Sequence, residues 1–574
     1  MANTSFPALA SMRRLPNLFD VVAGVCIFAV LIYVAGIARG TMAPLDAPET
    51  AAVVLDPAFL PGYAVRTTLR MFAALLCSML FTFLVATWAA KSRRAGLVLV
   101  PVLDVLQSVP ILGFLSFTVV FFMGLFPGQV LGAELAAIFA IFTSQAWNMT
   151  FSLYQSLKTV PADLDEAARS YRLSPWQRFW RLEVPFAMPG LVWNTMMSMS
   201  GGWFFVVASE AVSVGDATWK LPGIGSYVAL ALEQRDIAAV GYAILAMLVV
   251  ILAYDQLLFR PLVAWSAKFR FETTASEDAE DPWVLKLLRR TRLLRAVSGL
   301  IVTAFNAFGG LRLSLRPRER PASAPGTSRA ADAVFLVVMA AVLAVAVWYV
   351  ARFVAAALAW ADLLMALRLG LFTLLRVIVL MTLATVVWVP IGVWLGLRPA
   401  WGRRAQPVAQ FLAAFPANLF FPVFVVLIVR FSGNPDIWLT PLMILGTQWY
   451  ILFNVIAGAS AFPGDLKEAA RNFQVGGWLW WRRVMIPGIF PYYVTGAITA
   501  SGGSWNAAIV SEVASWGDTR LVAHGLGAYI AQATAEGATA QVVLGVAVMS
   551  AFVVAFNRLL WRPLYAFASR RLTL

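Results

Sequence analysis

The sequence predicts an all-α membrane protein with about twelve transmembrane helices, arranged in two parallel repeats of six spans. Hydrophobic residues make up 61% of the 574-residue chain and charged residues only 13%, and the mean hydropathy is +0.78. Apolar stretches of about 20 residues recur along the chain, and each is long enough to cross a hydrocarbon core about 30 Å thick. The second half of the sequence also repeats the first. These three observations together define the fold class.

The predicted spans fall at matching places in the two halves. In the first half they lie near residues 18–38, 66–90, 98–125, 129–153, 190–212 and 237–258. In the second half they lie near 333–351, 368–395, 407–430, 437–458, 490–512 and 539–560. An even number of spans per half makes the repeats parallel, so matching loops lie on the same side of the membrane.

Basic residues indicate which side that is. The net charge of +15 could suggest a nucleic-acid partner. However, Lys91, Arg93 and Arg94, and likewise Arg403 and Arg404, lie in short loops between apolar stretches. Arginine-rich loops of this kind face the cytoplasm. We therefore exclude a nucleic-acid partner and predict that both termini are cytoplasmic.

The duplication is visible as a constant spacing of 302 residues. Leu164-Asp-Glu-Ala-Ala-Arg169 recurs as Leu466-Lys-Glu-Ala-Ala-Arg471. The same spacing relates Pro185 to Pro487 and Glu210 to Glu512, whereas a slightly longer one pairs Arg70 with Arg376. The chain therefore divides into a first membrane domain over 1–270 and a second over 333–574.

Residues 271–332 differ in character from both domains. The stretch from Trp283 to Arg295 alternates leucines with basic residues, which is typical of a helix that lies in the membrane interface. The apolar segment 296–310 is short, and a span there would invert the second half. We therefore predict a cytoplasmic linker with an interfacial basic amphipathic helix.

A repeated cytoplasmic loop, over 158–190 and 461–491, is the most informative feature. Asp163 followed by Glu166 resembles a capping box, which would begin a short helix. One face of this helix would carry small and aromatic residues. These residues are Leu164, Ala167, Ala168 and Tyr171 in the first copy, and Leu466, Ala469, Ala470 and Phe473 in the second. Paired alanines make such a face shallow enough for a groove of another protein to close over it.

The Glu-Ala-Ala pattern is followed by the apolar steps Leu182-Glu-Val-Pro185 and Val484-Met-Ile-Pro487. Together they resemble the signature loop of ABC importer permeases. The surrounding residues look most like the nitrate, sulfonate, taurine and bicarbonate group, in particular its duplicated anion-transport permeases. The resemblance implies a type I ABC importer permease fold in a bacterial inner (plasma) membrane. It further implies two copies of a cytoplasmic ABC ATPase, which bind ATP and Mg²⁺, and an extracytoplasmic substrate-binding protein.

In that family the loop forms a coupling helix that docks into a groove of the ATPase. The resemblance implies this role for Glu166, Ala167, Ala168, Tyr171 and Arg172, and for Glu468, Ala469, Ala470, Phe473 and Gln474. Arg172 and Gln474 stand where the family usually has glycine, which tolerates a left-handed turn more readily. The simpler alternative is that each glutamate only caps its helix.

Small and polar residues in the spans are candidates for the substrate pathway. They are Gln107, Gln145, Asn148, Asn194, Ser198, Ser209, Gln448, Asn506 and Ser511. Close helix packing is the alternative role for the small residues of span five. Glu210 and Glu512, near the outer end of span five, are matched carboxylates. We interpret them as loop anchors because paired negative charges would not help an anion to pass.

Several function classes are excluded or disfavoured. His524 is the single histidine and lacks the partners of a metal site. There is no Ser-His pairing of the kind that catalysis requires. The chain also lacks the G-x-x-x-x-G-K-[ST] phosphate loop. We therefore expect a transport subunit that is not an enzyme and binds no cofactor itself. An ATP-independent secondary transporter with two six-span repeats remains the alternative.

Overall fold

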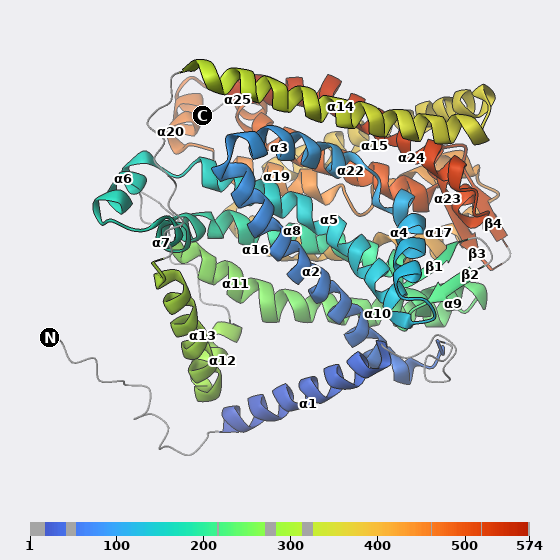
Figure 1. Ribbon diagram of the computed structural model, residues 1–574, viewed down its shortest axis with the longest axis horizontal. Coiled ribbons are helices and arrows are strands. Elements are labelled where there is room, and N and C mark those ends of the chain that lie inside the picture. Colours follow the sequence, from blue (N-terminus) through green and yellow to red (C-terminus); the bar gives the residue numbers. More distant parts are fainter. Residues whose placement is uncertain are drawn as a thin grey trace.

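The computed structural model describes residues 18–41, 53–214, 217–269, 283–312, 325–460, 462–517 and 519–571. Helices dominate this part of the chain, and its strands form two short antiparallel hairpins. The long helices run alongside one another, with α6 and α20 at one end of the molecule and the hairpins at the other (Figure 1). We call these the loop end and the hairpin end. The prediction of an all-α membrane fold is confirmed.

The elements of the first half follow the predicted order, with the hairpin strands β1 and β2 between α8 and α9. They are α1 (Leu18–Thr41), α2 (Leu60–Lys91), α3 (Arg93–Ser108), α4 (Ile111–Leu125), α5 (Val130–Lys158), α6 (Ala162–Ser170), α7 (Pro175–Arg178), α8 (Val184–Glu210), β1 (Ala211–Val214), β2 (Ala217–Lys220), α9 (Ile224–Glu233), α10 (Ile237–Tyr254) and α11 (Arg260–Ser266).

The second half repeats this order after the linker helices α12 (Trp283–Arg290) and α13 (Arg292–Gly310). Its elements are α14 (Pro325–Ala357), α15 (Trp360–Gly396), α16 (Pro399–Ala414), α17 (Phe421–Arg430), α18 (Pro435–Trp438), α19 (Trp449–Ser460), α20 (Gly464–Asn472), α21 (Gly477–Trp480), α22 (Ile486–Ser511), β3 (Val513–Trp516), β4 (Thr519–Val522), α23 (Leu526–Ala535), α24 (Thr539–Phe556) and α25 (Arg562–Arg571).

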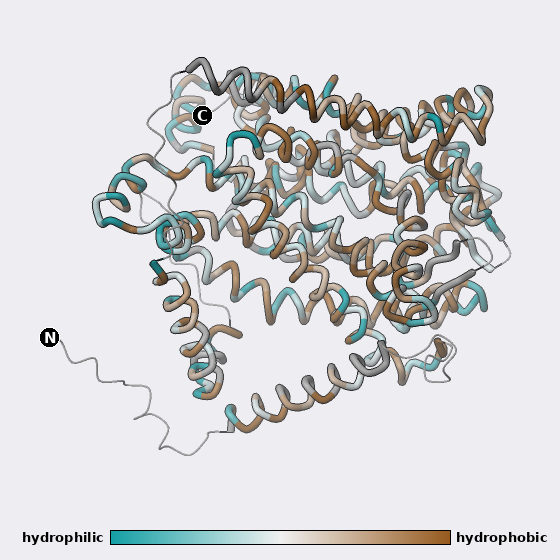
Figure 2. The backbone as a smooth tube through the Cα atoms, in the orientation of Figure 1, coloured by the Kyte–Doolittle hydropathy of each residue, from teal (hydrophilic) through white to brown (hydrophobic). Residues whose placement is uncertain are grey.

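Each predicted span coincides with a helix or with a broken helix pair. Among the described residues, 6 helices are long and apolar enough to cross a membrane, and a bent pair makes a seventh candidate. Figure 2 shows these long helices as largely hydrophobic, whereas α6 and α20 at the loop end carry many hydrophilic residues.

The third span of each half is broken, where an uninterrupted helix was expected over 98–125 and 407–430. The first break separates α3 from α4 at Val109 and Pro110. The second lies at Phe415 and Pro416, where the chain bends by 80°. Proline has no amide hydrogen and pushes the residue before it out of the helical conformation. The two prolines therefore end each helix at the same place in the repeat.

The fourth span differs between the halves. In the first half it is the continuous helix α5, whereas the span expected over 437–458 is a helix only from Trp449. The short α18 and a 3-10 turn over Thr440–Met443 precede it. Pro441 lies within this turn and has no counterpart in α5, where Phe139 holds the matching position. Proline cannot continue the helical hydrogen bonding, so the second copy begins its helix late.

The two halves interlock through their third spans. Helix α4 packs against α22 and α24 of the second half, and α16 packs against α8 and α10 of the first. Accordingly, Ile111 and Leu115 belong to the second half's core, and Phe415 and Leu419 belong to the first half's core. This exchange places a cavity lined by residues of both halves between them rather than inside either one.

The linker contains two helices instead of the single one expected over Trp283–Arg295. It is interrupted at Thr291, and α13 also includes the apolar segment 296–310. In Figure 1, α13 (green, lower left) runs across the direction of the spans at the loop end. Helix α14 begins at Pro325, before the expected boundary at 333.

Candidate functional site

Helices α6 and α20, for which the sequence predicts a coupling role and which we call the coupling helices, begin differently from the capping box expected at Asp163 and Glu166. Their N-cap residues are Pro161 and Pro463, and neither cap makes a side-chain hydrogen bond. Each helix therefore starts two residues earlier than the capping box predicted. Asp163 and Asp165 instead lie in the first turn of α6, where the helix dipole favours negative charge.

Both coupling helices end in the same hydrogen-bonded turn, a Schellman motif. In α6 the amide of Leu173 bonds to the Ala168 carbonyl (3.1 Å) and that of Arg172 to the Arg169 carbonyl (2.9 Å). In α20, Val475 and Gln474 make the equivalent bonds. Arg172 and Gln474 have φ angles of 53° and 50°. The left-handed bend is thus kept in both copies without the glycine that favours it.

The surfaces of the two coupling helices are alike. Glu166 and Glu468 are exposed, and so are the large aromatic side chains of Tyr171 (82%) and Phe473 (81%). Each helix therefore presents one large aromatic side chain, as well as its glutamate, on its outer surface.

The paired alanines do not share that outward surface, contrary to the expectation from sequence. Ala168 and Ala470 are buried, at 3% and 7% exposure, whereas Ala167 is exposed and Ala469 is half-buried. The second alanine of each pair is also the residue whose carbonyl accepts the amide bond that closes the turn, from Leu173 or Val475.

The contacts that hold the two coupling helices to the rest of the chain differ. Asp165 pairs with Arg178 (3.0 Å), and Arg178 lies 3.4 Å from Glu183. Glu183 is paired with Lys91 at the end of α2 (2.5 Å). The second copy lacks these charged groups at the matching positions. Lys467 replaces Asp165, Trp480 replaces Arg178 and Met485 replaces Glu183. Charged contacts therefore tie only the first coupling helix to its half in this way.

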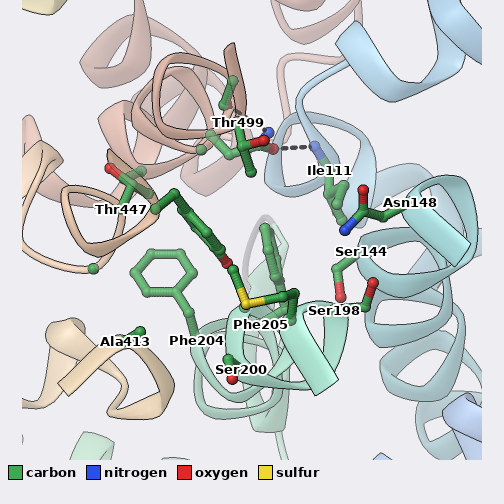
Figure 3. Close-up of a pocket in the computed structure, with 18 of the residues that line it drawn as sticks. Ile111, Ser144, Asn148, Ser198, Ser200, Phe204, Phe205, Ala413, Thr447 and Thr499 are labelled. Atoms are coloured by element: carbon green, nitrogen blue, oxygen red, sulfur yellow. Dashed lines mark hydrogen bonds between the residues drawn. The ribbon is translucent and has the colours of Figure 1, made fainter. Parts of the chain in front are cut away.

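A cavity of about 180 Å³ lies between the halves, and we call it the chamber. Helices α5 and α8 form one side, while α22 and the turn before α19 form the other. Figure 3 shows Ser144, Asn148 and Ser198 on one side and Thr447 on the other, with Phe204 and Phe205 nearby. Asn506 joins the halves at its edge by accepting a 2.7 Å hydrogen bond from the Ile111 amide. Among the described residues, the lining side chains are all uncharged.

Four of the predicted pathway residues line the chamber, namely Gln107, Asn148, Ser198 and Asn506. Ser144 and Asn148 lie one helical turn apart on α5, so they share a face. The sequence analysis missed several further lining residues. They are the hydroxyl-bearing residues Thr143, Ser144, Ser200, Thr447, Tyr450 and Thr499, and the aromatic residues Trp147, Phe204 and Phe415. The one-turn spacing of Ser144 from Asn148 was a signal available in the sequence.

The other five candidates lie away from the chamber wall. Gln145 is fully buried, and its Oε1 accepts a hydrogen bond from Ser78 of α2. The Asn194 side chain donates to Ser152 (3.0 Å), and Gln448 accepts from the Trp388 ring nitrogen (2.9 Å). Their polar groups therefore join helices to one another.

Ser209 and Ser511 are also removed from the chamber. Both are buried near the hairpin-end termini of α8 and α22. The Ser209 hydroxyl donates to the Val206 carbonyl in its own helix. Their matched positions reflect the packing of span five in both copies.

Glu210 and Glu512 are both buried, and each belongs to a charged cluster near the hairpin end. Arg70 donates to Glu210 (2.7 Å) and Glu134 (2.6 Å), and Glu210 also accepts from the Gly225 amide (2.6 Å). These contacts join the end of α8 to α2, α5 and the start of α9, which agrees with the interpretation of Glu210 as a loop anchor.

The matching cluster in the second half has the same topology. Arg376 donates to Glu512 (2.9 Å) and to Asp436 (2.8 Å). Asp436 also accepts hydrogen bonds from the backbone amide and the ring of His524. The equal spacing of Glu134 to Asp436 and of Glu210 to Glu512 was visible in the repeat. The sequence did not show that one arginine in each half binds both carboxylates.

A second cavity, of about 380 Å³, lies between the halves toward the hairpin end. Its wall includes the end of α8, α9, β3 and β4. Arg520 is its one charged lining residue among the described residues. Thr218 holds the matching position in the first half, so this cation breaks the symmetry of the duplicated fold.

Comparison with known proteins places the repeat in a family. The family described as the inner membrane component of binding-protein-dependent transport systems matches residues 78–259 and 388–563, which is more than half of the chain. The permease protein ProW of the Escherichia coli glycine betaine/proline betaine transport system is 30% identical over 186 residues, covering 32% of this chain and 49% of ProW.

Two cyanobacterial permeases are also similar. CmpB of the Synechococcus elongatus bicarbonate transport system is 25% identical over 177 residues, covering 31% of this chain and 60% of CmpB. The nitrate import permease protein NrtB of Leptolyngbya laminosa is 25% identical over 174 residues, covering 30% of this chain and 59% of NrtB. The matches thus span about half of the relatives' lengths. Because the family matches both halves, each with its coupling loop, this chain belongs to the family of binding-protein-dependent transport system inner membrane components.

Proposed function

We propose that this chain is the membrane-spanning permease of an ATP-driven ABC importer, with both halves of the translocation pathway in one polypeptide. The observation that carries the proposal is the pairing of two exposed coupling helices, α6 and α20, with a polar chamber enclosed between two interlocked repeats. In this role the chain is a transport subunit, and the chemical step belongs to a partner.

The partners follow from the same two helices. One coupling helix per half implies two copies of a cytoplasmic ATPase, each of which binds ATP and Mg²⁺. The exposed Tyr171 and Phe473 are the natural anchors, since buried aromatic side chains often dominate such contacts. The family description supports an extracytoplasmic binding protein that delivers the substrate at the opposite end.

The orientation rests on the basic loops. Lys91 ends α2 and Arg93 begins α3, and the junction of these helices lies at the same end as α6 and α20 (Figure 1). The positive-inside rule assigns this end to the cytoplasm. The first residues of α1 and the last residues of α25 also lie there (Figure 1), in keeping with cytoplasmic termini.

The substrate that we favour is a small anion such as nitrate, sulfonate, taurine or bicarbonate. Arg520 supports this choice because it adds a cation to a cavity wall that has no acidic residue among the described residues. A glycine betaine-like zwitterion is the second candidate. Trp147, Phe204, Phe205 and Tyr450 line the chamber, and aromatic faces attract quaternary ammonium groups.

The test is reconstitution of the full chain with its ATPase and binding protein in liposomes. We expect ATP-dependent uptake of radiolabelled nitrate or bicarbonate, and two ATPase copies per chain in the purified complex. Arg520→Gln should lower anion uptake more than Arg520→Lys. Preferential uptake of glycine betaine, unaffected by either change, would favour the second candidate.

Coupling is tested by the double variant Glu166→Ala and Glu468→Ala. It should hydrolyse ATP without uptake, whereas Glu536→Ala, an exposed glutamate after α23, should leave uptake unchanged. Uptake by the chain alone, driven by an ion gradient without ATP, would overturn the proposal and favour a secondary transporter.

A further inference from the structure

The linker helix α13 lies directly against the first coupling loop. The ring N–H of Trp176 donates to the Phe308 carbonyl (2.8 Å), and the Gln177 side chain donates to the Gly310 carbonyl (2.9 Å). The rings of Trp180 and Phe305 are in edge contact, with centroids 5.3 Å apart. Carbonyls in the last turn of a helix lack the usual amide partner from a following turn. The Gln177 side chain supplies one to Gly310, whereas the Phe308 carbonyl accepts from both Trp176 and the Leu311 amide.

The end of α13 is shaped for this contact. A Cβ atom at Gly309 would lie 3.2 Å from the Cβ of Trp180, and one at Gly310 would lie 3.2 Å from Nη2 of Arg181. Both distances are tighter than an ordinary van der Waals contact. The two glycines therefore allow the helix end to approach the loop closely.

The second coupling loop cannot receive the linker in the same way. Leu479 and Arg482 replace Gln177 and Trp180, which removes the amide donor and the packing ring. Trp478, which matches Trp176, is 73% exposed, and Leu479 is 52% exposed. The duplicated loops have thus diverged at the positions that hold the linker.

The remainder of the linker is fixed to the loop end of the first half. The Leu293 amide, at the start of α13, donates to the Asp20 carboxylate (2.9 Å). Asp20 lies in the first turn of the apolar helix α1, so the start of α13 lies at the boundary where that span begins. Trp283 of α12 donates to Gln256 (3.3 Å), just beyond α10.

The exposed surface of the linker combines apolar and basic side chains. Leu300 (72% exposed), Val302 and Phe305 are exposed on α13. Lys286 of α12 and Arg292 of α13 are exposed as well. A helix of this composition, lying across the spans at their ends, fits the surface of a bilayer that contains anionic lipids.

We propose that α12 and α13 form a clamp that binds anionic lipid headgroups and holds the first coupling loop in place. The basic side chains lie among the headgroups, the apolar ones enter the acyl boundary, and the end of α13 fixes Trp176 and Gln177. The consequence for transport rests on the proposed function, because the two ATPase contacts would then be unequal. Lipid binding and loop fixation do not depend on it.

The experiment measures amide hydrogen exchange of the full chain in nanodiscs, with and without 30% phosphatidylglycerol in phosphatidylcholine. We expect α13 and residues 174–183 to exchange more slowly in the anionic discs. Lys286→Gln with Arg292→Gln should reduce that protection by about tenfold or more, since each basic residue near the surface contributes about 1 kcal/mol. The control, Lys220→Gln with Arg430→Gln, removes equal charge at the hairpin end and should have no such effect.

A second pair of changes separates the clamp's two contacts. Gln177→Leu with Trp180→Arg gives the first loop the residues of the second. We expect faster exchange in 174–183 and a changed ratio of ATP hydrolysed to substrate transported, while α13 stays protected by anionic lipid. Equal exchange in neutral and anionic discs, or an unaltered loop in the Gln177 and Trp180 variant, would overturn the proposal. Because exchange is read without transport, either result is distinguishable from failure of the importer assignment.

Discussion

Arg70 and Glu210 are joined by a 2.7 Å hydrogen-bonded ion pair and are buried to 4% and 0% exposure, respectively. The pair fixes the end of α8 to α2 at the level where the hairpin β1–β2 begins. A buried charge is tolerated only when it is paired and hydrogen-bonded. Here Thr67 and the Gly225 amide complete the coordination of the carboxylate.

Removing the central cation should therefore be costly. Arg70→Met leaves Glu134 and Glu210 buried without a counter-charge, and loss of one partner of a buried pair costs about 3–5 kcal/mol. Arg376→Met should cost less because its partner Asp436 is 36% exposed and solvent can stabilise the remaining charge. Thermal unfolding of the purified variants in detergent checks the order. Equal losses at the two sites would contradict it.

The chamber offers a position where a side chain can block the pathway without disturbing the fold. Gly502 lines the chamber, and a Cβ atom there would meet no atom within 4 Å. We expect Gly502→Leu to reduce uptake strongly while the melting temperature of the complex stays nearly unchanged. Gly241→Leu is the matched control, since Gly241 is exposed on α10 and equally unobstructed. Normal uptake by the Gly502 variant would place the pathway elsewhere.

The left-handed turns after the coupling helices should be relieved by glycine. Arg172→Gly and Gln474→Gly remove a side chain from a conformation that costs about 1 kcal/mol for other residues. We expect slower amide exchange in α6 and α20, respectively. Arg169→Gly, at a helical position in the last turn of α6, should do the opposite because glycine in a helix costs up to about 1 kcal/mol. Faster exchange in the Arg172 variant would show that its side chain has a role beyond the turn.

Stability in acid should depend on Asp436, which lies outside the spanning helices. Partial burial opposes ionisation, but hydrogen bonds from the His524 amide and ring, together with Arg376, lower the pKa of Asp436 below its ordinary value. A group with a lowered folded-state pKa stabilises the fold above its unfolded-state pKa, and this stability is lost as the pH falls through the folded-state value.

We therefore expect Asp436→Asn to be less stable than the unaltered chain at neutral pH. The difference should begin to shrink below about pH 4, the ordinary pKa of an unfolded aspartate, and should shrink further as the pH falls through the lower folded-state pKa. Thermal unfolding between pH 3 and 7, conditions chosen to bracket this range, measures the difference. A gap that stays constant across the range would show that Asp436 acts through packing and not through its charge.

Local features of the sequence were sufficient to predict most of the architecture. The lengths of the apolar stretches predicted the spans, and the constant spacing that relates Leu164 to Leu466 indicated the duplication. Helices α6 and α20 followed from the Glu-Ala-Ala pattern, although Pro161 and not Asp163 is the N-cap of α6. Pro110 and Pro416 are visible in the sequence as potential helix breakers. The apolar composition on both sides of them nevertheless led to the prediction of uninterrupted spans.

The side chains that line the chamber were decided by the tertiary structure. Gln145 and Asn148 lie three residues apart on α5, yet Gln145 is buried against α2 and Asn148 faces the chamber. The rotation of a helix about its axis is set by its packing against helices that are distant in sequence. Likewise, no pattern in the sequence distinguishes Arg520. It lines the second cavity only because the fold places it between the halves.

By itself, the sequence determined the fold class, the repeat and the family, because these depend on composition and on periodic local patterns. The tertiary structure decided which polar groups meet across the halves and how the two coupling loops differ. Asp165 joins Arg178 and Gln177 bonds to Gly310 only because folding brings separate segments within hydrogen-bond distance. A hydrogen bond or an ion pair requires that proximity, and a linear sequence does not contain it.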